Sequence, residues 1–214
     1  MGSQPQPVTS APPRIFHYSL DWRFLLPAAE AQKTCLLFEE NEDFRQTLEQ
    51  VRLGVAQQIS FSELRDRKDK SVQLLAMPFG LPAARVGRGQ QDRVQFYVSL
   101  RRLIDSGGHL LVGFNNSLNL RANSRSLYRA SSPRSMTDEL RQAGFRSARI
   151  YGAMPSLQIP EYIFDIDPRA IHFALRNRFR RKPTVLHALR LLSGAIGWKR
   201  ISNFLPCYFA VAAA

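Results

Sequence analysis

The chain has 214 residues, enough for one α/β domain with a well-buried core but too few for two full domains. Hydrophobic residues make up 44% of it, which excludes a generally disordered chain. Its 30 Lys and Arg against 17 Asp and Glu give a formal charge of +13, which favours anionic partners such as nucleic acid, phosphorylated substrates or an acidic membrane surface.

The N-terminal region differs in composition from the rest. Residues 1–13 are rich in Gln and Pro, and we predict a short disordered lead without a signal peptide. Residues 14–27 are aromatic, and we interpret them as an arm that packs on the core. No apolar run is long enough to span a bilayer, and both Cys lie in apolar runs. We therefore expect a cytoplasmic protein with buried thiols.

The first half of the chain is predicted to contain three strands. Apolar strand patterns cover 33–39, 57–61 and 71–77, and a helix is expected over 43–51. The residues between the second and third strands are charged, and we interpret them as a solvated connection. The third strand ends at Met77-Pro78-Phe79-Gly80, a turn that belongs at the edge of a sheet.

The second half contains two helix and strand units. An apolar helix pattern at 94–104 is followed by Asp105-Ser106-Gly107-Gly108 and a strand at 109–114 that ends at Asn115-Asn116. A helix over 136–143 closes with Gly144-Phe145 and precedes a strand at 147–151. A last apolar strand is expected at 204–212. This order predicts an α/β fold with an open, mostly parallel Rossmann-like sheet and flanking helices.

The C-terminal segment is the cationic pole of the chain. We predict one or two basic amphipathic helices over 168–199, broken at Pro183, and no acidic residue follows Asp167. Aromatic residues alternate with cations there, which suits anionic lipid or nucleic acid, although a packed helix with a basic outer face has the same pattern. The candidate anion-binding residues are Arg176, Arg178, Arg180, Arg181 and Lys182.

We divide the chain into three parts: a lead at 1–13, a core with its aromatic arm at 14–160, and a basic helical segment with the final strand at 161–214. The strand that follows Gly107-Gly108 and the helix that ends in Gly144-Phe145 resemble the back half of class I methyltransferases that use S-adenosylmethionine (SAM). The resemblance covers roughly residues 71 to 155.

The resemblance implies SAM as the cofactor and transfer of a methyl group, which needs proximity more than a dedicated set of acids and bases. As acceptor we expect an anionic or membrane-associated small molecule or glycan. The site is implied beyond the carboxyl ends of the strands. The residues at those positions are Glu39, Asn41, Met77 and Phe79 for the cofactor, and Asn115 and Asn116 for the substrate.

Two features leave other functions open. The family's first strand ends in a glycine-rich turn, because only a backbone without Cβ can approach the cofactor closely, and residues 38–43 contain no glycine. The family also has an acid after the second strand, where Glu63 and Asp66 are the nearest candidates and are interpreted as solvated. The four His show no metal-ligand spacing, so we expect no metal site.

The second hypothesis is therefore a catalytically inactive methyltransferase-like subunit that binds a protein partner or acts as a scaffold. The third is a basic binder of nucleic acid or of an anionic membrane, acting mainly through the C-terminal pole and peripheral at the membrane.

Overall fold

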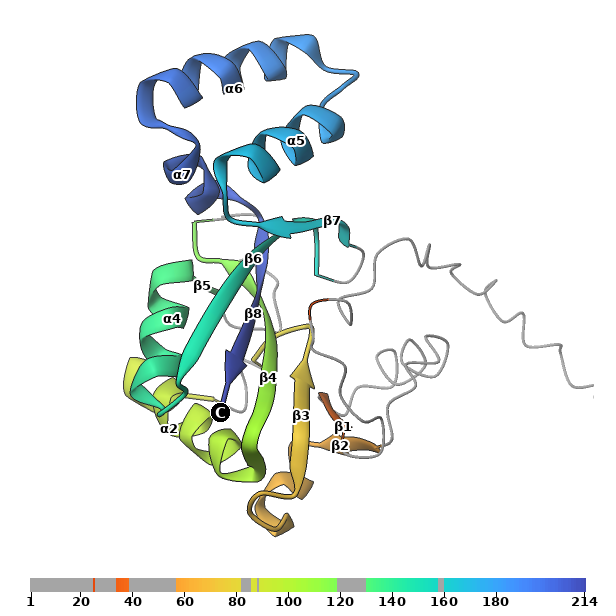
Figure 1. Ribbon diagram of the computed structural model, residues 1–214, viewed down its shortest axis with the longest axis vertical. Helices are drawn as coiled ribbons and strands as arrows, with labels where there is room; N and C mark the ends of the chain where they lie inside the picture. Colours follow the sequence, from red (N-terminus) through yellow and green to blue (C-terminus); the bar gives the residue numbers. More distant parts are fainter. Residues whose placement is uncertain are drawn as a thin grey trace, which may run out of the picture.

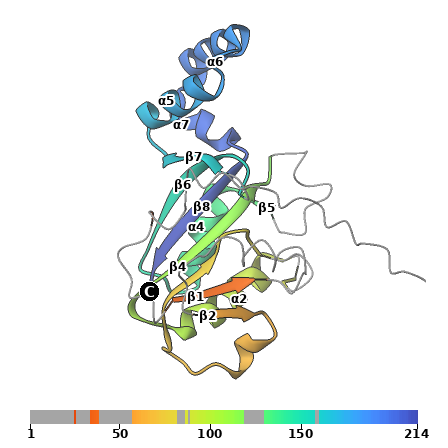
Figure 2. The ribbon, with the colours of Figure 1, turned by 90° about the vertical axis from the view of Figure 1, so that its right-hand side faces the viewer.

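The computed structural model describes Leu25 and residues 34–38, 57–81, 86–87, 89–118, 130–157 and 160–214. These residues form a twisted sheet with helices packed on it and a helical appendage (Figures 1 and 2). The strands are β1 (Thr34–Phe38), β2 (Gln57–Ser60), β3 (Val72–Met77), β4 (Ile104–Asn116), β5 (Ala130–Ser131), β6 (Ser147–Pro155), β7 (Pro160–Asp165) and β8 (Cys207–Ala213). The helices are η3 (Glu63–Asp66), α2 (Gln90–Leu103), α4 (Pro133–Gln142), α5 (Pro168–Arg178), α6 (Pro183–Ile196), α7 (Trp198–Ile201) and η4 (Ser202–Phe204).

The strand order is β2-β1-β3-β4-β8-β6-β7, with β5 paired to β4. Strands β1 to β5 pair in parallel, and β8 runs against both β4 and β6, so β6 points the same way as the parallel strands. Strand β7 runs against β6. The predicted Rossmann-like, open and mostly parallel sheet is therefore confirmed.

The C-terminal strand β8 lies inside the sheet. It pairs antiparallel with β4 from Cys207 to Ala213 and with β6 over the same residues. The sequence predicted a strand at 204–212 but not its place between two strands of opposite direction. Strand β7, which pairs with β6 at the edge of the sheet, was not predicted. The helix expected at 43–51 lies outside the described residues.

The two glycine signatures have structural explanations. Gly144 follows α4 with a φ of 89°, Phe145 N–H donates to Leu140 O at 3.1 Å, and Gly144 N–H donates to Arg141 O at 3.0 Å. This is a Schellman motif, which needs a left-handed residue at the Gly144 position. At Gly108 an added Cβ would lie 2.5 Å from Gln73 O, where the pairing of β3 and β4 shifts register.

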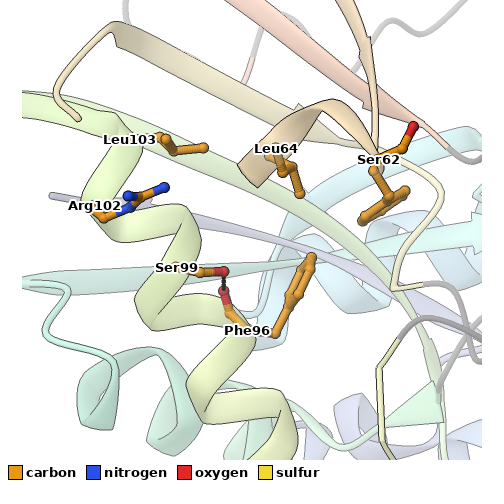
Figure 3. A pocket seen from close by; sticks show the side chains of 7 residues that line it. Ser62, Leu64, Phe96, Ser99, Arg102 and Leu103 are labelled. Atoms are coloured by element: carbon orange, nitrogen blue, oxygen red, sulfur yellow. Dashed lines mark hydrogen bonds between the residues drawn. The ribbon is translucent and has the colours of Figure 1, made fainter. Parts of the chain in front are cut away.

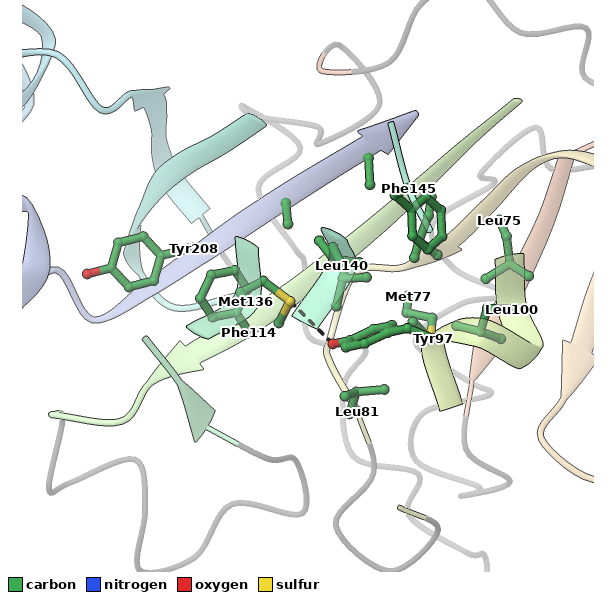
Figure 4. Close-up of a cluster of buried hydrophobic side chains, with 14 of the residues drawn as sticks. Leu75, Met77, Leu81, Tyr97, Leu100, Phe114, Met136, Leu140, Phe145 and Tyr208 are labelled. Carbon is green, nitrogen blue, oxygen red and sulfur yellow. Dashed lines mark hydrogen bonds between the residues drawn. The ribbon is translucent and has the colours of Figure 1, made fainter. Parts of the chain in front are cut away.

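Helices α2 and α4 cover one face of the sheet and enclose the larger core (Figure 4). Tyr97 of α2 is fully buried there, and its hydroxyl donates to Met136 Sδ of α4 at 3.3 Å. Helix α4 begins at Pro133, earlier than the predicted 136, because Ser132 Oγ accepts from Ser135 N–H and caps the helix.

The opposite face of the sheet carries a smaller core. Its buried members are Ala76, Leu111, Ala153, Leu157, Cys207 and Phe209. Leu25 packs against this core. The arm predicted at 14–27 therefore contacts the core at its one described residue, and the rest of the arm lies outside the described residues.

The appendage consists of α5, α6 and α7 and lies beyond β7 (Figure 1). Asp167 caps α5 by accepting from the N–H groups of Arg169 and Ala170, and Pro168 occupies the first turn. Helix α6 begins at Pro183, where the sequence predicted a break. His172 and Trp198 pack edge to face, with ring centroids 5.1 Å apart, and so join α5 to α7.

A buried ion pair joins the two core helices. Arg93 of α2 donates from Nε at 3.0 Å and from Nη2 at 2.6 Å to Glu139 Oε1 of α4. Ser135 Oγ donates to the same oxygen at 2.7 Å. Glu139 is fully buried, and its hydrogen bond raises the pKa of Arg93. The pair fixes how α2 packs against α4, because neither charge can lose its partner without being left desolvated.

We expect Glu139→Ala to lower the free energy of unfolding by about 3–5 kcal/mol, because it leaves the Arg93 guanidinium half-desolvated without its carboxylate. The control is Asp165→Ala, which removes the exposed bidentate pair of Arg149 with Asp165 and should cost less than about 1 kcal/mol. Urea denaturation followed by circular dichroism measures both. Equal losses of unfolding free energy would show that the buried ion pair stabilises the fold no more than the exposed pair does.

Candidate functional site

The strand order has a switch point at the carboxyl ends of β1 and β3, the place where open α/β sheets have their ligand-binding crevice. The chain passes from β1 to β2 on one side and then returns to place β3 on the other side of β1. Figure 2 shows β1 and β2 beside each other at one end of the sheet. Open α/β sheets bind ligands at such a switch point, because the connections on the two sides diverge and leave a gap. Glu39 and Asn41 follow β1 directly but lie outside the described residues.

The turn after β3 is held tightly against β4. Gly80 has a φ of 105°, and its N–H donates to Met77 O at 3.2 Å. A Cβ added at Gly113 of β4 would lie 1.9 Å from Pro78 O. The turn can therefore lie across β4 only because residue 113 is glycine.

The residues predicted at this edge divide between the two faces of the sheet. The Met77 side chain is 1% exposed and belongs to the core under α2 and α4. Phe79 is half-buried and packs against the smaller core on the opposite face. Asn115 is half-buried and, two and four residues from Gly113 and Leu111, lies on that same face. Phe79 and Asn115 thus share a face, and Met77 does not lie on it.

Asn116 points to the other face and connects the end of β4 to the chain that leads into β8. Its Nδ2 donates to Asn203 O at 2.6 Å and to Leu205 O at 2.7 Å, and its Oδ1 accepts from Leu118 N–H at 3.0 Å. The side chain is 1% exposed. These bonds use both amide hydrogens and one oxygen lone pair, so the observed contacts are structural, and substrate binding by Asn116 stays a prediction.

Glu63 lies at the carboxyl end of β2. Its Oε2 accepts from the N–H of Ser60, the last residue of β2, at 3.1 Å. The hydroxyls of Ser60 and Ser62 are 2.7 Å apart beside it. Glu63 is exposed, in agreement with its interpretation as a solvated charge, but its contact with Ser60 was not predicted. The signal was present in its position, since an acid just after the second strand is where Rossmann-like sheets bind ribose hydroxyls.

A second concavity lies between η3 and α2, and Figure 3 shows Leu64 and Phe96 pointing toward it from these two elements. Its volume is about 530 Å³. Ser99 Oγ donates to Phe96 O at 2.6 Å and Arg102 pairs with Asp69 at 3.0 Å, so these polar groups already have partners. The lining residues are Phe61, Ser62, Leu64, Phe96, Ser99, Arg102 and Leu103. The lining is mixed, with polar and apolar side chains, and it contains no acid and base pair.

Burial shifts the pKa of two titratable side chains in the sheet, the buried Cys207 and the half-buried His109. Burial raises the pKa of the Cys207 thiol to about 12, and its Sγ donates to Ala153 O at 3.2 Å. It is therefore a protonated thiol and not a nucleophile. Burial lowers the pKa of His109, which keeps this side chain neutral at pH 7. In the ranges that the structure describes, no cluster of His, Cys, Asp and Glu could hold a metal ion.

No protein-family model and no curated protein matches the chain. Among solved structures, a SAM-dependent methyltransferase from Archaeoglobus fulgidus matches with a TM-score of 0.48 and 12% identity over 84% of this chain and 75% of that one. A SAM-dependent methyltransferase from Thermotoga maritima matches with a TM-score of 0.46 and 11% identity over 89% and 84%. A phosphoethanolamine N-methyltransferase from Haemonchus contortus matches with a TM-score of 0.44 and 13% identity over 90% and 51%.

We expect Asn116→Ala to lower the free energy of unfolding by about 2–4 kcal/mol, because it removes the Asn116 donor from the buried Leu205 carbonyl and from the partly buried Asn203 carbonyl. The neighbouring Asn115→Ala, at a half-buried position on the other face, should cost clearly less. Thermal and urea denaturation of both variants make the comparison. If Asn116→Ala proved as stable as the native chain, its hydrogen bonds would not support the fold.

Proposed function

We propose that the chain is a SAM-dependent methyltransferase whose site lies beyond the carboxyl ends of β1, β3 and β4. The observation that carries the proposal is the change of strand order at β1, the arrangement at which open α/β sheets bind ligands. The sequence resemblance over residues 71 to 155 supports it, because its Gly-Gly strand and Gly-Phe helix form here as strand β4 and helix α4.

In this proposal the cofactor is held by Glu39 and Asn41 after β1 and by Phe79 after β3, while the buried Met77 supports the turn from behind. We add Glu63, whose carboxylate at the end of β2 is placed to accept hydrogen bonds from ribose hydroxyls. When bound, SAM supplies an activated methyl group. The protein has only to bind and orient an acceptor in line with it, and Asn115 can do so through neutral hydrogen bonds.

The acceptor is proposed to be an anionic or membrane-associated small molecule or glycan. The support is electrostatic, since a chain with a formal charge of +13 concentrates anions near its surface. The cationic appendage also leaves the sheet at the carboxyl ends of β4 and β6, because β8 begins there opposite Asn115 and Ala153.

A second candidate function is an inactive methyltransferase-like subunit that binds a protein partner. The observation that favours it is the absence of glycine from residues 38–43. A turn with side chains at every position leaves less room for a close approach of the cofactor.

Calorimetric titration with SAM and with its demethylated product tests the proposal. We expect binding to the native chain, and at least a roughly tenfold weaker affinity for Glu39→Ala/Asn41→Ala, since these changes remove hydrogen-bonding groups of the crevice. The matched control, Asp138→Ala/Gln142→Ala, removes the same kinds of group from α4 and should bind as the native chain does. Absence of heat with the native chain would reject the enzyme and favour the inactive subunit.

We further expect Glu63→Gln to weaken SAM binding roughly tenfold, because a neutral amide accepts weaker hydrogen bonds from hydroxyls than a carboxylate does. Gln keeps an oxygen for Ser60 N–H, so the melting temperature should change little. Asp66→Asn on the same η3 is the control. Equal affinities for the two variants would remove Glu63 from the site.

A further inference from the structure

Helix α6 is apolar but uncovered. None of its residues is buried, and Leu191 and Leu192 are 65% and 43% exposed. Leu186 and Leu189 face the groove toward α5 and α7. Outward positions of α6 therefore carry apolar side chains. In a helix exposed to water, such positions ordinarily carry charged or polar residues. In Figure 1, α6 is the element farthest from the sheet.

Helix α5 combines the same exposed apolar character with positive charge. Phe173 is 66% exposed. Arg169 and Arg176 lie four residues before and three residues after it, so all three share one face of the helix. Aromatic rings between arginines are suited to the boundary between lipid headgroups and acyl chains, where the ring inserts and the cations bind phosphates.

The turn between α5 and α6 concentrates further charge. Arg180, Arg181 and Lys182 are exposed there and have no acidic partner among the residues that the structure describes. They precede the N-terminus of α6, which has no side-chain cap, so its first N–H groups add to the positive potential. Arg178 is different, because it pairs with Glu161 of β7 at 3.1 Å.

The position of the appendage connects it to the crevice edge. The chain enters it from β7 and leaves it through α7 and η4 into β8. Strand β8 starts at Cys207, opposite Asn115 and Ala153, at the carboxyl ends of β4 and β6. A surface bound by the appendage would thus lie on the side of the sheet where the crevice opens. No helix in the described ranges is long and apolar enough to cross a membrane.

We propose that the α5–α6 hairpin docks on the surface of an anionic phospholipid bilayer. Its cations bind headgroup phosphates, while Phe173, Leu191 and Leu192 enter the boundary with the acyl chains. Nucleic acid would bind the cations but leave the exposed apolar side chains in water. A bilayer accounts for both the cations and the exposed apolar side chains. The inference does not depend on whether the chain binds SAM.

The test is sedimentation of the full chain with vesicles of phosphatidylcholine, with and without phosphatidylglycerol, at low and high salt. We expect binding only to the anionic vesicles, weakened by salt. Replacing three basic residues should lower the partition coefficient roughly 100-fold, since each contributes a factor of about five near an anionic surface. That variant is Arg180→Gln/Arg181→Gln/Lys182→Gln. Leu191→Ser/Leu192→Ser should lower it roughly tenfold or more by removing apolar area.

Matched controls distinguish a specific effect of the α5–α6 hairpin from effects of net charge and of exposed apolar surface in general. One variant removes the same charge from the region of α4: Arg134→Gln/Arg141→Gln/Arg146→Gln. Another removes exposed apolar side chains elsewhere: Val98→Ser/Leu118→Ser. Both should bind vesicles as the native chain does, and circular dichroism should show that every variant is folded.

Several outcomes would overturn the proposal. An equal loss of vesicle binding by the α4 charge variant would mean that binding depends on net charge and not on the hairpin. Unchanged binding by Leu191→Ser/Leu192→Ser would mean that these side chains do not insert into the bilayer. Absence of binding to anionic vesicles at low salt would reject it directly. A labelled duplex DNA and a labelled RNA are titrated in parallel, and tighter binding to either, insensitive to the Leu changes, would assign the surface to nucleic acid instead.

Discussion

The structure depends on the insertion of β8 between β4 and β6. These two strands run in the same direction but do not pair with each other, so β8 supplies the hydrogen bonds that join the parallel strands to β6 and β7. Buried side chains along it, such as Tyr208 and Phe209, enter the cores on opposite faces of the sheet. Asn116 secures the start of β8 by binding carbonyls on the approach to it. The appendage and both cores therefore share one central strand.

The sequence predicted best those features that neighbouring residues determine. Pro183 begins α6, because proline has no N–H and fits the first turn of a helix. Gly144-Phe145 ends α4, because glycine readily adopts the positive φ that this helix end requires. It did not predict β7 or the central place of β8. The strand pattern of 204–212 fits an edge as well as a centre, and the choice depends on partners far away in the chain.

The candidate site likewise depends on contacts between residues far apart in the sequence, which the sequence did not predict. Strand periodicity places Asn115 and Asn116 on opposite faces, which the sequence implies, but it does not say which face carries the main core. Packing of α2 and α4 decides this and turns Asn116 and Met77 inward. The sequence named Glu63 and Asp66 together as candidates for the acid after the second strand, and only the fold shows that the Glu63 carboxylate lies beside the end of β2. Residues after β1 are assigned from sequence alone.

The central place of β8 also affects the order in which the molecule can form. His109 pairs with Ala213, about 100 residues later in the chain, so β4 and β6 are complete well before the strand that joins them exists. Contacts this distant in sequence form late, because a long loop must close before they stabilise anything. Until then β4 and β6 each present an unpaired edge that another chain could extend. We infer that late folding intermediates are the species most exposed to aggregation, and that rescue by chaperones would act on them.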